Sequence, residues 1–118
     1  MQTLDKAKSC LEIIKERKAL DPVLFEVRNL TSITDYFLIA SGNSSRQVQA
    51  ITRHLQTKMR EAGFRAYGVE GEQGGHWVLM DYGDVVIHIF YHPIREFYDL
   101  EGLWIEAPRV NIKDKVTI

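Results

Sequence analysis

The chain has 118 residues, a formal charge of -1 and a single cysteine, Cys10. This length suits one domain with one core, and the near-neutral charge argues against a protein held on DNA or RNA mainly through phosphate contacts. One cysteine excludes an intramolecular disulfide and every zinc site built from several cysteines, which is typical of proteins in a reducing compartment.

The first third of the chain predicts one helix and two strands. Apolar residues three and four positions apart indicate an amphipathic helix over residues 3–20, which Asp21-Pro22 would end because proline disfavours helix at the residue before it. The alternation that follows predicts a strand over 23–28. Residues 36–40 form an uninterrupted apolar run, so we expect this second strand to be buried on both faces.

A second helix is predicted to begin after the Gly42-Asn43 turn. Ser44 followed three residues later by Gln47 is a capping box, which satisfies backbone N–H groups at the start of a helix. Gly63 stands where a glycine commonly ends a helix in a left-handed conformation. The apolar stripe predicted for this helix comprises Val48, Ile51, Leu55 and Met59.

The remaining predicted elements are three strands and a last helix. Residues 65–69 suggest a short strand, and the runs 77–82 and 85–91 predict a hairpin because they flank Gly83-Asp84, a favoured two-residue turn. A helix over 93–104 begins with proline, which the first helical position tolerates. We expect the segment after this helix to be irregular or to form an edge strand.

These elements predict a single α/β domain with a mixed β-sheet covered by helices. The strand, helix and strand between residues 36 and 69 are long enough for a parallel crossover, and the hairpin adds antiparallel strands. Helices from both ends of the sequence would cover the open faces of the sheet. We assign residues 1–104 to the domain and 105–118 to a C-terminal tail.

The turn Ser41–Arg46 is a candidate for binding a phosphate group. It places a glycine and small hydroxyl residues between a buried strand and a helix start, where backbone N–H groups can hold an anion. It contains neither the lysine of a Walker motif nor a G-x-G-x-x-G pattern. Nucleotide binding, or a nucleotidyltransferase-like activity at this loop, is therefore the alternative function, and helix capping is the simpler interpretation.

No group of residues predicts a metal site, a cofactor or a catalytic centre. His88 and His92 are too far apart on a strand to share one metal ion, and a lone inward-facing histidine is usually a hydrogen-bonded core residue. The strand after Gly83-Asp84 lacks the carboxylates that a two-metal site needs. The apolar runs are too short to cross a membrane, and the N-terminus resembles neither a signal nor a transit peptide.

Aromatic and acidic residues gather between Trp77 and Tyr98. Six of the chain's 12 aromatic residues (two Trp, five Tyr and five Phe) lie in this stretch. One interpretation is a hairpin and helix that close the core. The other is a protein-binding face, because Trp and Tyr beside charged groups are typical of interface hot spots. The acidic residues in the stretch would suit a basic partner.

Four segments of the chain occur in the order and spacing of a known family. They are DYFLIASGNSSRQVQAI at 35–51, VEGE at 69–72, WVLMDYGDVVIHIF at 77–90 and REFYDLEGLW at 95–104. Together they resemble the ribosomal silencing factor family, also called Iojap-like. The resemblance implies a small mixed-sheet domain distantly similar to nucleotidyltransferases but without their catalytic carboxylates, and therefore neither an enzyme nor a cofactor-binding protein.

The resemblance also implies a partner. Members of the family bind protein fourteen of the large ribosomal subunit, on the face that meets the small subunit, and so block subunit joining and slow translation when nutrients are scarce. The mechanism is steric and breaks no bond. Free members are commonly dimers, so a homodimer is a further expected partner, and the lack of an organelle-type N-terminal extension favours a bacterial, cytoplasmic member.

The same resemblance indicates which residues contact the partner, with Trp77 as the expected anchor. Because side chains alternate along a strand, a face that presents Trp77 also presents Leu79 and Asp81, while Met80 and Tyr82 point the other way unless a bulge intervenes. The expected partner-binding residues are Trp77, Leu79, Met80, Asp81, Tyr82, Arg95 and Tyr98.

Overall fold

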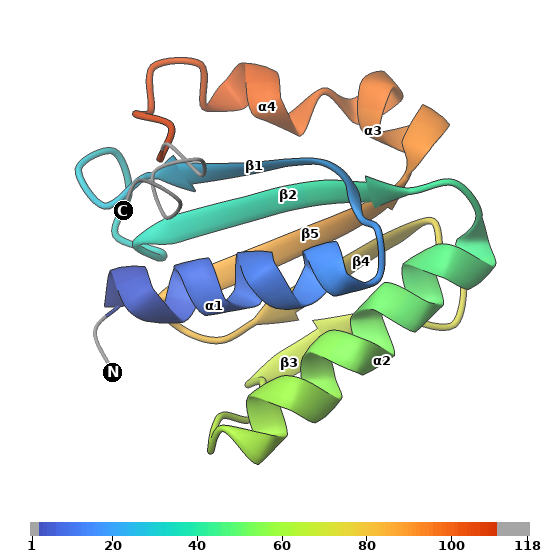
Figure 1. Ribbon diagram of the computed structural model, residues 1–118. Helices are drawn as coiled ribbons and strands as arrows, with labels where there is room; N and C mark the ends of the chain where they lie inside the picture. The colour runs from blue at the N-terminus through green and yellow to red at the C-terminus, as the bar shows by residue number, and fades with distance from the viewer. Residues whose placement is uncertain (1–2, 111–118) are drawn as a thin grey trace, which may run out of the picture.

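Two parallel strands, β2 (Tyr36–Gly42) and β5 (Val85–Tyr91), lie side by side at the centre of the sheet in a computed structural model that describes residues 3–110 (Figure 1). Every residue of β2 is buried, as is every residue of β5 before Tyr91. The prediction that the strand over 36–40 is buried on both faces is therefore confirmed. A strand of this kind needs a covering layer on each side of the sheet.

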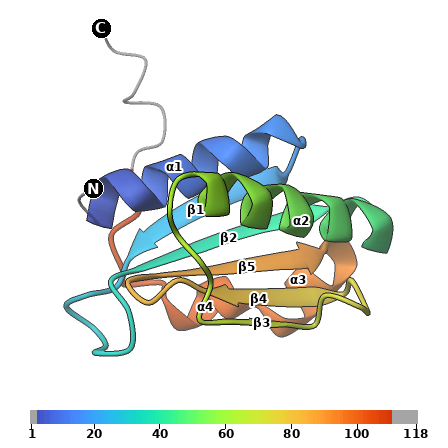
Figure 2. The ribbon, with the colours of Figure 1, turned by 90° about the horizontal axis from the view of Figure 1, so that it is seen from below.

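The sheet has five strands in the order β1-β2-β5-β4-β3, which Figure 2 shows from one face. Beside the central pair lie β1 (Leu20–Glu26) and β4 (Trp77–Asp81), and β3 (Gly68–Glu70) forms the far edge. All neighbours except β2 and β5 are antiparallel, so the mixed sheet and the hairpin of β4 and β5 are confirmed.

The parallel crossover differs from the expectation in its second strand. The strand that follows α2 (Ser45–Glu61) in the sequence is β3, yet β2 pairs with β5. The place beside β2 is buried on both faces and requires a long apolar strand, which β5 supplies. The three residues of β3 are too short and too exposed for that place, so β3 pairs with β4 at the edge.

Helices cover both faces of the sheet, as predicted. α1 (Thr3–Glu16) and α2 lie on one side, while α3 (His92–Tyr98) and α4 (Leu100–Leu103) lie on the other (Figure 1). The predicted stripe of α2 is buried in full. Among residues 3–110, no helix combines the length and apolar character that crossing a membrane requires.

The core consists of two clusters, one on each side of the sheet. The cluster beneath α1 and α2 includes Leu38, Val78, Met80, Tyr82 and Ile87. The cluster beneath α3 and α4 includes Phe25, Phe37, Ile39, Val86 and Phe90. Each of the strands β2, β4 and β5 contributes to both clusters because successive side chains point to opposite faces.

The first helix ends earlier than predicted. α1 stops at Glu16, and β1 has already begun at Leu20, opposite Ser41. The short connection turns through Lys18, which has a φ of 61°, and the register of β1 shifts between Leu20 and Val23. Pairing with β2 recruits residues whose local pattern fits a helix, because a sheet edge beside a buried strand must be covered.

The predicted last helix is divided, and the chain beyond it belongs to the fold. Asp99, with a φ of 47°, separates α3 from α4. The backbone N–H of Val110 donates to the carbonyl of Leu24 on β1, and Ala107 is buried in the second cluster. The expected domain boundary at residue 104 is thus too early, and the rest of the predicted tail, residues 111–118, lies outside the described residues.

The segment between β3 and β4 is held closely against the start of α2. Gly75 is buried with a φ of +68°, and a Cβ atom there would lie 2.8 Å from the carbonyl oxygen of Ser45. The Gln49 side chain donates to the carbonyls of Glu72 and Gln73 at 3.2 and 2.8 Å. The segment held in this way immediately precedes the first residue of β4.

We expect Gly75→Ala to lower the free energy of unfolding by about 2–4 kcal/mol, because left-handed backbone strain adds to the overlap with Ser45. Gly63→Ala is the matched control, since Gly63 also has a positive φ, +96°, but no atom lies within 4 Å of its added Cβ. It should cost only the strain, about 1–2 kcal/mol. Urea denaturation measures both values, and equal losses would contradict the close approach.

Candidate protein-binding surface

Trp77, the first residue of β4, is half-buried and is held on three sides. Its indole stacks on the ring of Phe90 with centroids 5.0 Å apart, and the ring of Tyr98 from α3 lies 4.9 Å away. Its Nε1 donates a hydrogen bond of 3.1 Å to Nδ1 of His88. The register of the hairpin, which sets Trp77 opposite Phe90 and Leu79 opposite His88, produces this arrangement.

His88 is the buried polar group that orients Trp77. It is 5% exposed, and its ring meets the edge of Phe37 at 5.3 Å. Burial lowers its pKa to about 4, so the imidazole is neutral near pH 7. Because Nδ1 accepts the hydrogen bond from the indole N–H, the proton of the neutral imidazole lies on Nε2. The interpretation of His88 as a hydrogen-bonded core histidine is confirmed.

The aromatic contacts continue from the core to the surface. Tyr98 is 53% exposed and Phe97 is 79% exposed, and their rings meet edge to face at 5.2 Å. On β4, Leu79 and Asp81 share the face of Trp77 and are partly exposed. We call these five residues, Trp77, Leu79, Asp81, Phe97 and Tyr98, the aromatic face.

The alternation along β4 divides the predicted contact residues as parity requires. Met80 and Tyr82 point to the opposite side of the sheet, where they are 0% and 2% exposed and pack in the cluster beneath α1 and α2. No bulge interrupts β4 where it pairs with β5. The expectation that Met80 and Tyr82 share the contact surface of Trp77 is corrected, because both side chains lie on the far side of the sheet from Trp77.

Arg95 is likewise internal, which corrects its predicted role as a contact residue. It is 6% exposed, and its Nε and Nη2 donate hydrogen bonds to the two carboxylate oxygens of Glu101, at 2.9 and 3.2 Å. It also donates to Ser41 Oγ at 2.9 Å and to the carbonyls of Leu20 and Asp21. Arg95 therefore ties α3 to α4 and to the ends of β1 and β2, and it positions the aromatic face from behind.

The loop Ser41–Arg46 acts as a helix cap. Ser44 Oγ accepts the N–H of Gln47 at 3.1 Å, and the Gln47 side chain accepts the N–H of Asn43, so the predicted capping box is present with Asn43 as its second donor. The Ser41 hydroxyl is occupied by Arg95. The nucleotide-binding alternative loses these groups to contacts within the chain. Within residues 3–110, no three His, Cys, Asp or Glu residues gather as metal ligands would.

Sequence reasoning missed the support beneath the aromatic face. Phe90 and His88 hold Trp77, and behind them Phe37 contacts the ring of Trp104 at 5.0 Å. The signal for the first pair is present in the sequence, because a two-residue turn at Gly83-Asp84 determines which residues of the hairpin face each other. No local signal indicates the contact of Phe37 with Trp104.

Comparisons with known proteins show the family to which the chain belongs. The model of the family described as "Ribosomal silencing factor during starvation" matches residues 1–117. The chain belongs to the ribosomal silencing factor family. A ribosomal silencing factor of Chromobacterium violaceum is 38% identical over 104 residues, covering 88% of this chain and 85% of the relative. As the curated names describe a regulator of ribosomes, the chain is a ribosomal silencing factor by family and not an enzyme.

The chain is also similar to a solved structure and to a more distant protein. A crystal structure of a Chromobacterium violaceum protein superposes with a TM-score of 0.86 at 38% identity, covering 88% of this chain and 87% of that one. A mouse protein named for mitochondrial assembly of the ribosomal large subunit is 31% identical over 97 residues, which cover 80% of this chain and 42% of the relative. The likeness to the crystal structure confirms the mixed-sheet α/β fold.

Stability should fall in acid because of His88. Its pKa is about 4 in the folded chain and 6.5 in the unfolded one, so the unfolded state binds more protons between these values. The free energy of unfolding is therefore highest above pH 6.5 and falls by about 3 kcal/mol in total as the pH decreases toward 4. Denaturant unfolding at pH 7, 5.5 and 4 measures this loss.

His88→Gln provides the control for that measurement. The variant keeps an acceptor for the Trp77 indole and does not titrate, so it should lose less stability than the unmodified protein as the pH falls from 6.5 to 4. Parallel losses in the two proteins would show that another group carries the acid sensitivity.

Proposed function

We propose that this chain binds protein fourteen of the large ribosomal subunit through the aromatic face and thereby prevents the small subunit from joining. The observation that carries the proposal is the immobilised, half-exposed indole of Trp77. A large aromatic side chain that is already ordered loses little conformational entropy when it binds, which is a property of interface hot spots. Repression of translation in the bacterial cytoplasm follows from that binding.

The charges around the aromatic face favour a basic partner. Asp81 lies on β4 beside Leu79, and Glu96 and Asp99 are exposed on and after α3. Acidic groups at the rim of an interface increase the rate of encounter with a positively charged surface. Proteins that sit on ribosomal RNA are commonly basic, so a ribosomal protein matches this side of the molecule.

The proposed mechanism is exclusion by volume. The chain measures 33 × 33 × 30 Å, which is wide enough to occupy the place of contacts between two subunits when one side is anchored. The sheet and the two core clusters make the body rigid, so it does not yield to a competing surface. No covalent step is required of any residue.

Trp77→Ala should weaken binding to purified large subunits by about thirtyfold, the effect of losing a hot spot of about 2 kcal/mol. Leu79→Ala, which removes the neighbouring apolar contact, should weaken it by a smaller factor. Co-sedimentation with separated large subunits measures the affinity. Addition of small subunits then tests whether the bound protein keeps the two apart.

Ile33→Ala is the matched control, because Ile33 is an exposed apolar residue, 74% accessible, in the connection between β1 and β2. It should leave binding unchanged. Circular dichroism confirms that each variant is folded. If Trp77→Ala and Ile33→Ala bound alike, the aromatic face would not be the contact, and if bound protein left joining unaffected, the steric mechanism would fail.

We further propose that two free copies associate through the same face. Phe97 and Tyr98 expose apolar rings next to Trp77, and a self-complementary patch of this kind suits a two-fold dimer. Dimer and ribosome would then compete for one surface. Analytical ultracentrifugation should show a dimer that dissociates when protein fourteen is added, and a dimer that persists in the complex would contradict the shared surface.

A further inference from the structure

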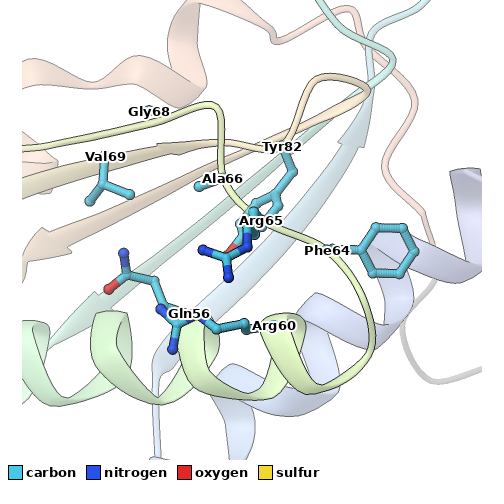
Figure 3. Close-up of a pocket in the computed structure, with 8 residues that line it drawn as sticks. All are labelled: Gln56, Arg60, Phe64, Arg65, Ala66, Gly68, Val69 and Tyr82. Atoms are coloured by element: carbon cyan, nitrogen blue, oxygen red, sulfur yellow. The ribbon is translucent and has the colours of Figure 1, made fainter.

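A pocket of about 180 Å³ lies on the other side of the sheet from the aromatic face, between the C-terminal half of α2 and the segment that leads to β3 (Figure 3). Gln56 and Arg60 reach it from α2, and Arg65 reaches it from the connecting segment. The lining residues are Gln56, Arg60, Phe64, Arg65, Ala66, Gly68, Val69 and Tyr82.

The charge of this pocket is positive and unbalanced. Within residues 3–110, the side chain of neither Arg60 nor Arg65 makes an ion pair or a hydrogen bond, and none of the lining residues is acidic. The nearest acid along the helix, Glu61, pairs with Lys58 at 3.9 Å. Arg60 stands in the last turn of α2, where a cation also suits the helix dipole, but Arg65 lies beyond the helix and has no such role.

Tyr82 supplies a third donor from the core. The residue is 2% exposed, yet its side chain contributes to the wall of the pocket, and its hydroxyl has no hydrogen-bond partner among the described residues. Burial raises the pKa of Tyr82 to about 12, because its effect is larger than the opposing effect of the positive charge of Arg60. The hydroxyl therefore keeps its proton near pH 7. Because it is not one of the fully enclosed side-chain oxygens that lack a partner, the hydroxyl is accessible from the pocket and can donate a hydrogen bond there.

The strand end that carries Tyr82 is well anchored. Lys6 of α1 donates to the Tyr82 carbonyl at 3.0 Å, pairs with Asp84 at 2.8 Å and lies 4.8 Å from the centre of the Phe64 ring. These contacts occupy Lys6 and Asp84 with each other and leave the two arginines as the free cations of the pocket among the described residues. The floor is thus rigid, while the arginines at the mouth are exposed.

We propose that this pocket binds the phosphate end of a small ligand, with Arg60 and Arg65 pairing with its charged oxygens and the Tyr82 hydroxyl donating a hydrogen bond. Forked guanidinium groups match phosphate oxygens, and two of them suit a ligand with at least two negative charges. The volume is below that of sites that enclose whole cofactors, so the pocket takes one or two phosphate groups while the remainder of the ligand stays outside. This site is independent of the aromatic face.

Calorimetric titration of the full chain at constant ionic strength tests the proposal. The probes are inorganic pyrophosphate, ADP, adenosine, malonate and a short single-stranded RNA. We expect saturable binding of pyrophosphate and ADP, one molecule per chain, and none of adenosine, which lacks phosphate. ADP binding more tightly than pyrophosphate would assign the ligand to nucleotides, and the reverse would assign it to inorganic phosphates.

Variants locate the binding. Arg65→Gln and Arg60→Gln should each weaken pyrophosphate binding by about tenfold or more, because each removes a charge-assisted hydrogen bond. Tyr82→Phe removes the hydroxyl alone and should weaken it by a smaller factor with the fold intact. Arg53→Gln is the matched control, since it removes the same charge from an exposed position of α2 outside this pocket and should change nothing.

Three results would overturn the proposal. The first is a failure of pyrophosphate and ADP to bind saturably, and the second is an equal loss in Arg53→Gln, which would indicate attraction to the basic helix in general. The third is equal or tighter binding of malonate or RNA, which would assign the pocket to carboxylates or to a nucleic-acid surface. Binding to large subunits should be unchanged in Arg65→Gln, so failure here is separable from failure of the aromatic face.

Discussion

The parallel pairing of β2 with β5 is the constraint on which the rest of the molecule depends. Both strands are buried on both faces, so the chain must supply a covering layer above and below them. On one side the amphipathic helices α1 and α2 do so. On the other side α3 and α4 are short, and Ala107 and Trp104 complete the cover. The layered domain follows from two apolar strands that no other arrangement would shield from water.

The strand β4 marks where that cover becomes incomplete. It pairs with the enclosed strand β5 on one side and with the exposed edge strand β3 on the other. Its alternate residues Val78 and Met80 therefore belong to the core, while Trp77 and Leu79 lie at the margin of the second cluster. The hydrogen bond from Trp77 to His88 fixes an aromatic group that is only half covered. One face of β4 therefore packs in the core, and its other face holds an ordered aromatic group at the surface.

The near-zero net charge conceals two chemically opposite surfaces. The aromatic face includes Asp81, and the exposed Glu96 and Asp99 flank Phe97 and Tyr98 in the chain, whereas α2 carries Arg46, Arg53, Lys58 and Arg60 against the single acid Glu61. The helices α2 and α3 lie on opposite sides of the sheet (Figure 1). A protein partner bound at the aromatic face leaves the pocket beside Tyr82 accessible, so the two proposed activities do not compete for space.

The sequence by itself determined the elements that depend on local chemistry: the capped start of α2, the hairpin around Gly83-Asp84 and the double burial of residues 36–40. It also determined the family and, by parity, that Trp77 and Met80 face opposite ways. Only the tertiary structure decided that β5 lies beside β2, that Arg95 is internal and that Tyr82 opens onto a pocket. Arg95 donates a hydrogen bond to Ser41, which is 54 positions away in the sequence, and local periodicity carries no information about contacts between residues so far apart in the chain. A local pattern predicts which residues of a strand share a face, but the packing of helices from distant parts of the chain determines which face remains exposed to solvent.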